Sequence, residues 1–330
     1  MSLSRKVENR MFKAKRFLPV VGLLLFAYIV NSVGVSVITE AFLKTNPLYF
    51  IVALSLTSVS SGIKAYKWKL GVDVQKPGFK FFEAWKAFII GLFAAVITPG
   101  RLGEIIKAIY AADNRKIRTG KAFATVFIDR VIDTLLIFLL AIIGIYYMTA
   151  EFALGFSTPK TAIAVFIAFG IVVFLVLEEG VTRNMLRPVF RKIIPKKHQA
   201  ILKTNFEEFY EGVRAIRKER LLLLKISALT MLAWFFVFIQ YYLLSLAAGI
   251  DISYFYIAMI MPVSMLAELA PISISGIGTR DLVLIGMFGL LGIGAGSAVA
   301  FSLIVLLFNY CIAAIGLFFW MKDPIKIWRL

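Results

Sequence analysis

Residues 94–107 read Ala94-Ala95-Val96-Ile97-Thr98-Pro99-Gly100-Arg101-Leu102-Gly103-Glu104-Ile105-Ile106-Lys107. The stretch is apolar at both ends, yet its middle holds a proline, two glycines, a cation and an anion. Pro99 removes a backbone donor and Gly100 tolerates a turn, so we expect a helix that is broken here. At membrane depth such a break is tolerated only where protein buries it or where it lines a wet cavity.

A second segment, residues 268–281, repeats this pattern. It reads Glu268-Leu269-Ala270-Pro271-Ile272-Ser273-Ile274-Ser275-Gly276-Ile277-Gly278-Thr279-Arg280-Asp281. Both segments combine proline, glycine, arginine and an acid within an apolar environment. We expect the two segments to face one another and to form the functional site.

The composition indicates a membrane protein. Hydrophobic residues make up 60% of the 330 residues and charged residues only 17%, which is far from the usage of soluble domains. The net charge of +18 comes from lysines and arginines in short runs beside apolar segments. Such runs are typical of the positive-inside rule and of contact with anionic lipid, so we expect no nucleic-acid partner. With one cysteine and one histidine, we expect no disulfide, no metal site and no cofactor.

The basic runs also set the predicted topology. The basic leader at 1–16 is expected in the cytoplasm, and the apolar run 17–38 is long enough to be a retained first span. The second span is expected at 48–63, followed by a cytoplasmic loop that carries Lys64, Lys67 and Lys69. A basic C-terminal tail places both termini of this multi-pass protein on the cytoplasmic side of the cell membrane.

We therefore expect an all-α polytopic membrane protein with about six spanning helices. Its predicted parts are a basic N-terminus at 1–16, a first membrane half at 17–177, a cytoplasmic segment at 178–220 and a second membrane half at 221–330. Within the cytoplasmic segment, residues 200–220 space apolar side chains at near-helical intervals. This spacing predicts an amphipathic helix that lies on the membrane surface or caps the bundle.

Charge counting gives the two broken segments opposite orientations. Both flanks of the segment near 87–112 are basic and belong inside, whereas the segment near 254–291 must enter and leave outside. Each is then a re-entrant hairpin of two half-helices. Inverted repeats with corresponding broken helices are typical of transporters whose substrate site lies near the middle of the bilayer.

Charged side chains inside the apolar segments are the candidate binding residues, because a charge near the bilayer centre costs about 2.5–3.5 kcal/mol. Arg101 and Arg280 each follow a glycine-rich break, where free amides and a helix N-terminus favour a phosphate. Thr98, Ser273 and Ser275 add hydroxyl donors. The full predicted site is Thr98, Gly100, Arg101, Glu104, Asp129, Arg130, Asp133, Glu268, Ser273, Ser275, Gly276, Gly278, Arg280 and Asp281, with no catalytic residue.

Three motifs occur in order along the chain. They are Thr98-Pro99-Gly100-Arg101-Leu102-Gly103-Glu104, then Asp129-Arg130-Val131-Ile132-Asp133, then Pro271-Ile272-Ser273 with Gly276-Ile277-Gly278-Thr279-Arg280-Asp281. Together they resemble the flippase-like transmembrane family of lysylphosphatidylglycerol synthases. In fused members, a soluble domain makes aminoacylated phosphatidylglycerol and the membrane part moves it to the outer leaflet. The resemblance implies the translocating half without the synthase, and therefore no enzyme.

The predicted function is that of a lipid flippase or scramblase. Its substrate would be a polar-headed phospholipid, such as an aminoacylated phospholipid or a polyprenyl-phosphate-linked lipid. We expect no ATP hydrolysis, because Gly120-Lys121-Ala122 lacks the upstream glycine and the Ser or Thr of a P-loop. A secondary transporter of a small anionic solute and an intramembrane lipid-modifying enzyme stay open as alternatives. The expected partner is a membrane lipid with an anionic or aminoacylated headgroup; homo-oligomers and a separate lipid-synthesising enzyme are further candidates.

Overall fold

The computed structural model describes residues 28, 31, 35–115, 117–153, 158–184, 196–269 and 275–322. These residues form helices joined by short connections, and no β-strand occurs among them. The predicted all-α class is therefore confirmed for this part of the chain. The predicted first span at 17–38 lies almost wholly outside it, and only its end enters helix α2 (Val35–Leu43).

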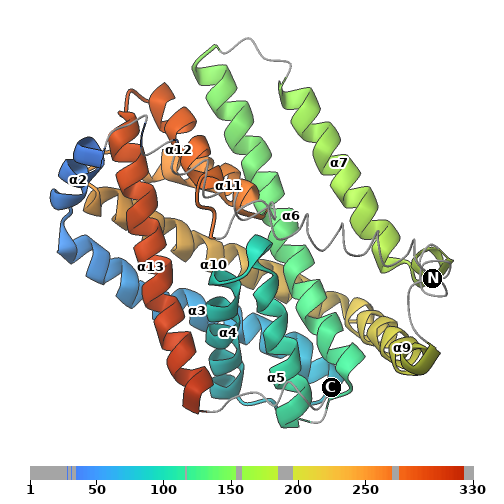
Figure 1. The fold of residues 1–330 in the computed structure, drawn as a ribbon. Coiled ribbons are helices and arrows are strands. Elements are labelled where there is room, and N and C mark those ends of the chain that lie inside the picture. Colours follow the sequence, from blue (N-terminus) through green and yellow to red (C-terminus); the bar gives the residue numbers. More distant parts are fainter. Residues whose placement is uncertain are drawn as a thin grey trace, which may run out of the picture.

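The helices follow one another in two similar series (Figure 1). The first series is α3 (Pro47–Gln75), α4 (Phe81–Val96), the 3-10 segment η1 (Pro99–Ile105), α5 (Ile106–Arg115) and α6 (Thr119–Glu151). After α7 (Thr158–Leu177) and α9 (Lys196–Lys218), the second series is α10 (Arg220–Ala247), α11 (Tyr254–Leu269), α12 (Thr279–Leu290) and α13 (Ala295–Lys322). The α4–α5 pair and the α11–α12 pair occupy opposite ends of the bundle (Figure 1).

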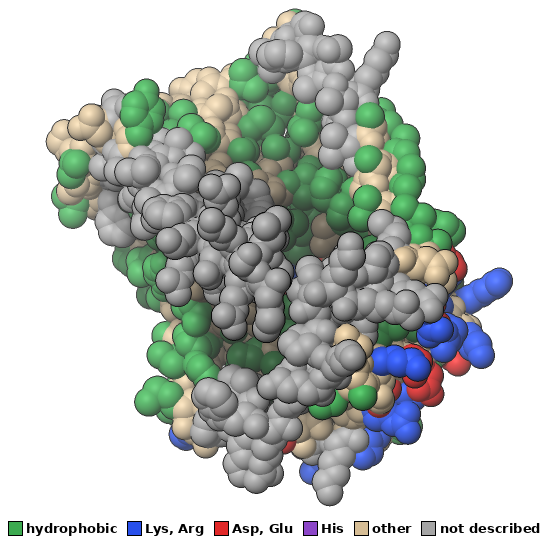
Figure 2. All heavy atoms as spheres, turned by 45° about the vertical axis from the view of Figure 1, so that its right-hand side comes forward, with side chains coloured by type: hydrophobic (Ala, Val, Ile, Leu, Met, Phe, Trp, Pro, Cys, Tyr) green, Lys and Arg blue, Asp and Glu red, His purple; other side chains and the backbone are tan. Residues whose placement is uncertain are grey.

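Three described helices, α3, α10 and α13, are long and apolar enough to cross a membrane. Two shorter apolar helices, Phe166–Leu177 and Tyr254–Leu269, accompany them. Figure 2 shows hydrophobic side chains over much of one face, whereas Lys, Arg, Asp and Glu side chains gather at the end where Figure 1 places α9. An outer surface with this distribution suits contact with lipid on the apolar part and with water at the charged end.

The two series pack in equivalent ways. Helices α3 and α10 lie against each other, α4 lies against α13, and α11 lies against α6. Each of the last two crossings is made close by a glycine: a Cβ added to Gly316 of α13 would come within 2.4 Å of the Ile89 carbonyl oxygen of α4. A Cβ on Gly144 of α6 would come within 2.2 Å of the Met259 carbonyl oxygen of α11. Small residues of this kind let membrane helices approach closely.

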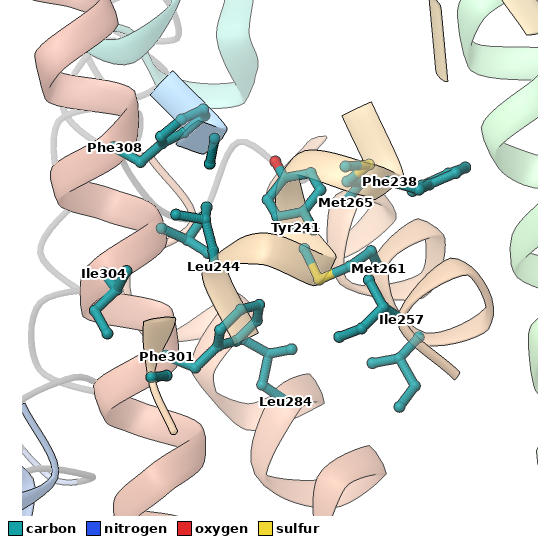
Figure 3. Close-up of a cluster of buried hydrophobic side chains, with 14 of the residues drawn as sticks. Phe238, Tyr241, Leu244, Ile257, Met261, Met265, Leu284, Phe301, Ile304 and Phe308 are labelled. Atoms are coloured by element: carbon teal, nitrogen blue, oxygen red, sulfur yellow. The ribbon is translucent and has the colours of Figure 1, made fainter. Parts of the chain in front are cut away.

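A large apolar core joins the second series. Figure 3 shows Phe238, Tyr241 and Leu244 of α10 facing Ile257, Met261 and Met265 of α11, with side chains of α12 and α13 beside them. All of these side chains are buried. The core fixes the position of α11 and α12, and therefore of the second break, relative to α10 and α13.

Helix α9 confirms the predicted amphipathic helix, and it caps the bundle. Its Val213 and Ile216 are buried against Ala124 and Ile128 of α6. At the polar edge, Lys121 Nζ donates a hydrogen bond of 2.8 Å to Glu211 Oε1. This hydrogen bond and the positive charge of Lys121 lower the pKa of the Glu211 carboxyl. The apolar contacts and the hydrogen bond attach α9 to the first part of α6, directly before the charged residues 129–133 of that helix.

We predict that Gly120→Leu loosens the docking of α9. A Cβ at Gly120 would lie 2.2 Å from the Asn205 carbonyl oxygen and 2.7 Å from the Phe209 nitrogen of α9, so the helices must separate. Overpacking of this kind costs about 1–3 kcal/mol. Proteolysis within residues 196–218 should accelerate in the variant. Gly170→Leu on α7, where an added Cβ meets nothing within 4 Å, is the matched control; equal cleavage of both variants would contradict the prediction.

The structure corrects the predicted end of the second span. Helix α3 continues to Gln75, so Lys64, Lys67 and Lys69 lie within the helix and not in a cytoplasmic loop. The helix is able to continue because Lys67 is buried and paired inside the bundle and Lys69 pairs with Asp73 one turn later. This correction brings α3 lysines into the functional site.

Candidate functional site

The first break is a tight turn followed by a 3-10 helix. Gly100 and Arg101 both have left-handed backbone conformations, with φ of 59° and 57°. The Thr98 hydroxyl holds the turn, because it donates to the Ala94 carbonyl oxygen at 2.8 Å and accepts from the Gly103 nitrogen at 2.7 Å. The 3-10 segment runs to Ile105, and α5 begins at Ile106.

The second break has similar backbone features. Ser275, Gly276 and Gly278 have φ of 54°, 75° and 86°, after which α12 begins at Thr279. The Gly278 nitrogen donates to Asp281 Oδ2 at 2.7 Å and so satisfies a free amide at the start of α12. A left-handed residue other than glycine costs of order 1 kcal/mol, so Arg101 and Ser275 are held in place by their surroundings. The predicted site residue Ser273 lies outside the described part of the chain.

The two breaks touch one another. Ser275 Oγ donates a hydrogen bond of 2.6 Å to the carbonyl oxygen of Val96, the last residue of α4. Arg101 NH1 lies 3.6 Å from Glu268 Oε2 at the end of α11. Between them lies a cavity of about 10 Å³, lined by residues of both breaks and by Asn309 of α13. This volume is that of about one water molecule, so the space between the breaks is nearly closed.

On the α3 side of the first break, a lysine binds two carboxylates. Lys67 Nζ lies 3.2 Å from Asp129 Oδ1, and it also forms an ion pair with Asp133. A further hydrogen bond of 3.0 Å joins Lys67 to Thr230 Oγ1 of α10. The Trp234 indole nitrogen, also on α10, donates to Asp133 Oδ1 at 3.3 Å. Lys67, Asp129 and Asp133 are all buried, so their charges depend on one another.

Glu104 connects this group to the first break. Arg130 NH2 lies 2.6 Å from Glu104 Oε2, and Arg130 NH1 donates to Glu104 Oε1 at 2.8 Å, which makes a two-pronged pair. Arg101 Nε lies 3.7 Å from the same carboxylate. Lys107 of α5 donates to Asp129 Oδ2 at 2.6 Å and completes a continuous chain of alternating charges from α3 to the break.

Arg280 is enclosed on the other side of the cavity. Its side chain is 1% exposed, with hydrogen bonds from Nε to Ser302 Oγ at 2.7 Å and from NH2 to the Ser302 carbonyl oxygen at 2.9 Å. NH1 donates to Glu268 Oε1 at 3.2 Å and to the Ser275 carbonyl oxygen at 3.3 Å. The Ser302 hydroxyl also hydrogen-bonds Asp281. All three nitrogens of the Arg280 guanidinium are therefore engaged.

A family model for the lysylphosphatidylglycerol synthase transmembrane region matches residues 17–316 of the chain. The chain belongs to this family. It is a multi-pass membrane protein, as the resemblance noted in its three motifs predicted.

Three membrane proteins similar to this lysylphosphatidylglycerol synthase transmembrane family member match it over most of their length. A UPF0104 membrane protein of Methanocaldococcus jannaschii is 25% identical over 305 residues, which are 90% of each chain. One from Methanothermobacter thermautotrophicus is 24% identical over 315 residues, covering 90% of this chain and 92% of the relative. One from Pyrococcus horikoshii is 23% identical over 309 residues, covering 88% and 91%. No solved structure matches the chain.

In this family member the structure brings the described part of the predicted site together, although the residues come from three separate stretches of sequence. The residues that sequence reasoning missed as site members are Lys64, Lys67, Lys107, Thr230, Trp234, Ser302 and Asn309. Lys107 lies within the broken segment at residues 94–107, and its spacing of three from Glu104 was a usable signal of the pairing. The described residues contain no group of three His, Cys, Asp or Glu side chains that could hold a metal ion.

Proposed function

We propose that the protein moves a polar-headed phospholipid between the two leaflets, with the headgroup passing between the two helix breaks. The observation that carries this proposal is the direct contact between the breaks, through Ser275 with Val96 and Arg101 with Glu268. A polar zone of this kind, enclosed by apolar helices, gives a charged headgroup a path through the bilayer that avoids hydrocarbon.

The arrangement of the two series supports a finer architecture, namely about six spans and two re-entrant hairpins of opposite orientation in an inverted repeat. The pairing of α4 with α13 corresponds to that of α11 with α6, and a glycine makes each crossing close. The α4–α5 and α11–α12 pairs lie at opposite ends of the bundle (Figure 1). Under this proposal the two hairpins enter the bilayer from opposite sides of the membrane.

Within this mechanism Arg101 is the proposed contact for the lipid phosphate. Its side chain is 30% exposed and its two ion-pair distances of 3.6 and 3.7 Å are too long for hydrogen bonds. Arg280 has a different role in this proposal: its hydrogen bonds hold α12, α13 and Glu268 together beside the path of the headgroup. Because the cavity has room for about one water, the headgroup passes only when the two breaks separate.

Reconstitution tests the proposal. Proteoliposomes containing tail-labelled fluorescent phosphatidylglycerol are exposed to dithionite, which bleaches only the outer leaflet. With functional protein, bleaching should exceed about half of the signal, because inner-leaflet lipid reaches the outside; protein-free vesicles should stop near half. A parallel arm follows uptake of radiolabelled inorganic phosphate. Phosphate uptake without lipid movement would replace the proposal by solute transport, and a chemically altered lipid would replace it by catalysis.

A further inference from the structure

Lys64 differs from the other cations of the site. It lies on α3, one turn before Lys67, and its Nζ sits 3.8 Å from the ring centroid of Trp234. The other five cations each have a carboxylate within 4.0 Å, whereas Lys64 has none among the described residues. Trp234 lies half-way along α10, a candidate span, so this unpaired charge lies level with the middle of that helix. A cation–π contact attracts an ammonium but does not neutralise it.

The charges around Lys64 add to this imbalance. Those of Lys67, Arg130 and Arg101 repel it, and the carboxylate of Asp133 attracts it. That carboxylate is already engaged by Lys67, by Arg130 NH2 at 3.3 Å and by the Trp234 indole nitrogen. Asp133 therefore cannot balance Lys64 as well.

The whole network carries one surplus positive charge. Its cations are Lys64, Lys67, Arg101, Lys107, Arg130 and Arg280, and its carboxylates are Glu104, Asp129, Asp133, Glu268 and Asp281. With all groups ionised, six positive charges face five negative ones in the part of the chain that the structure describes. A net charge held away from water is costly, and a bound anion would remove that cost.

The surplus positive charge lies near side chains that have unused hydrogen-bond donors. Arg101 and Arg130 have side chains 30% and 34% exposed, whereas Lys67, Lys107 and Arg280 are at most 1% exposed. The guanidinium of Arg101 makes contacts too long for hydrogen bonds. Arg130 Nε also has no acceptor among the described residues, and this atom is buried although the rest of the side chain is partly exposed. Lys64 is also partly exposed. Three partly exposed cations, on α3, η1 and α6, thus surround Glu104 and Asp133, and Lys64 and Arg101 among them retain unused donors.

We infer that the lipid carried by this site has a headgroup with net negative charge, and that Lys64 selects it together with Arg101 and Arg130. The inference rests on the proposed function and names the class of headgroup: a phosphate without a compensating amine. An aminoacylated headgroup brings a net positive charge, which would face the surplus cation. Phosphatidylglycerol and prenyl phosphates fit the site, and lysyl-phosphatidylglycerol does not.

Competitive binding tests the inference separately from transport. Purified protein is incubated with equal amounts of phosphatidylglycerol, phosphatidylcholine and lysyl-phosphatidylglycerol, and the retained lipids are counted by native mass spectrometry. We expect phosphatidylglycerol to be retained about tenfold over lysyl-phosphatidylglycerol, as one unpaired charge in a partly buried site predicts. Lys64→Gln should abolish most of this preference, and Lys64→Arg should keep it. Lys69→Gln is the matched control, because Lys69 lies on the same helix and pairs with Asp73 outside the site.

Each outcome has a distinct meaning. Retention of lysyl-phosphatidylglycerol over phosphatidylglycerol, or an unchanged preference in Lys64→Gln, overturns the inference even if lipid is translocated. If phosphatidylglycerol binds with the expected preference but no lipid moves in proteoliposomes, the charge inference holds and the proposed function fails. Excess inorganic phosphate provides a further arm: if it displaces phosphatidylglycerol and is itself taken up, the site serves a free anion and the lipid assignment is wrong.

Discussion

Replacement of Lys67 by methionine is expected to destabilise the protein by about 3–5 kcal/mol, the usual cost of breaking a buried ion pair from one side. The loss would leave the carboxylates of Asp129 and Asp133 buried together without the ammonium that both of them contact. Thermal unfolding in detergent is measured by the labelling of Cys311, the sole cysteine of the sequence and partly buried, with a thiol-reactive dye. The melting temperature should fall clearly.

Two further variants test the reason for this loss. Lys69→Met removes an ion pair that is 20% and 25% exposed, and should cost at most about 1 kcal/mol. The double variant Lys67→Met with Asp133→Asn removes one of the two stranded charges, so its destabilisation should be smaller than the sum of the single ones. Additive losses, or equal melting of Lys67→Met and Lys69→Met, would show that Lys67 is not the centre of a coupled charge group.

Substitution of Arg101 by alanine is expected to slow lipid translocation by about tenfold or more, equivalent to about 1.4 kcal/mol in the barrier. Arg101 is the proposed phosphate contact, and it is also the only described residue of η1 whose side chain reaches across to Glu268. Translocation is measured by dithionite bleaching in proteoliposomes containing equal amounts of protein. Arg101→Lys should also be slow, because an ammonium does not reproduce the planar fork of a guanidinium.

One more variant separates the effect of the Arg101 backbone conformation from the effect of its side chain. Its φ of 57° favours glycine, so Arg101→Ala changes the side chain within a strained turn, whereas Arg101→Gly removes the same guanidinium and relaxes the turn. If both variants are equally slow, the guanidinium is responsible. Normal transport by Arg101→Gly would instead assign the effect to the conformation of the turn. Arg217→Ala on α9, which removes an exposed ion pair with Glu178, is the matched control and should transport normally.

The positions of the two breaks were predictable because their cause is local. Pro99 and Gly100 cannot continue a helix comfortably, and charges within an apolar stretch require protein around them. The periodicity of residues 200–220 likewise predicted α9. The 3-10 form of η1 was not predictable, because it depends on Thr98 closing the turn onto Gly103 rather than on helix propensity.

The α3 lysines were missed for a physical reason. A lysine that follows an apolar run usually marks the membrane surface, so Lys64 and Lys67 indicated the end of a span. Only the acids of α6, far along the sequence, allow Lys67 to stay inside. Ser302 carries no sequence signal at all, since a serine in an apolar helix is usually a packing residue, and its role becomes visible only once Arg280 lies beside it.

The hydrogen bond between Ser275 and Val96 and the 3.6 Å pair between Arg101 and Glu268 are the polar links between the two breaks in the described residues. A neutral hydrogen bond and a partly exposed ion pair are each worth about 1 kcal/mol. The residues on each side of this contact between the breaks, by contrast, are held together by several buried charges. We therefore expect these two polar links to break more readily than the ion pairs on either side, so that under the proposed function a lipid gradient could drive the opening without a chemical fuel.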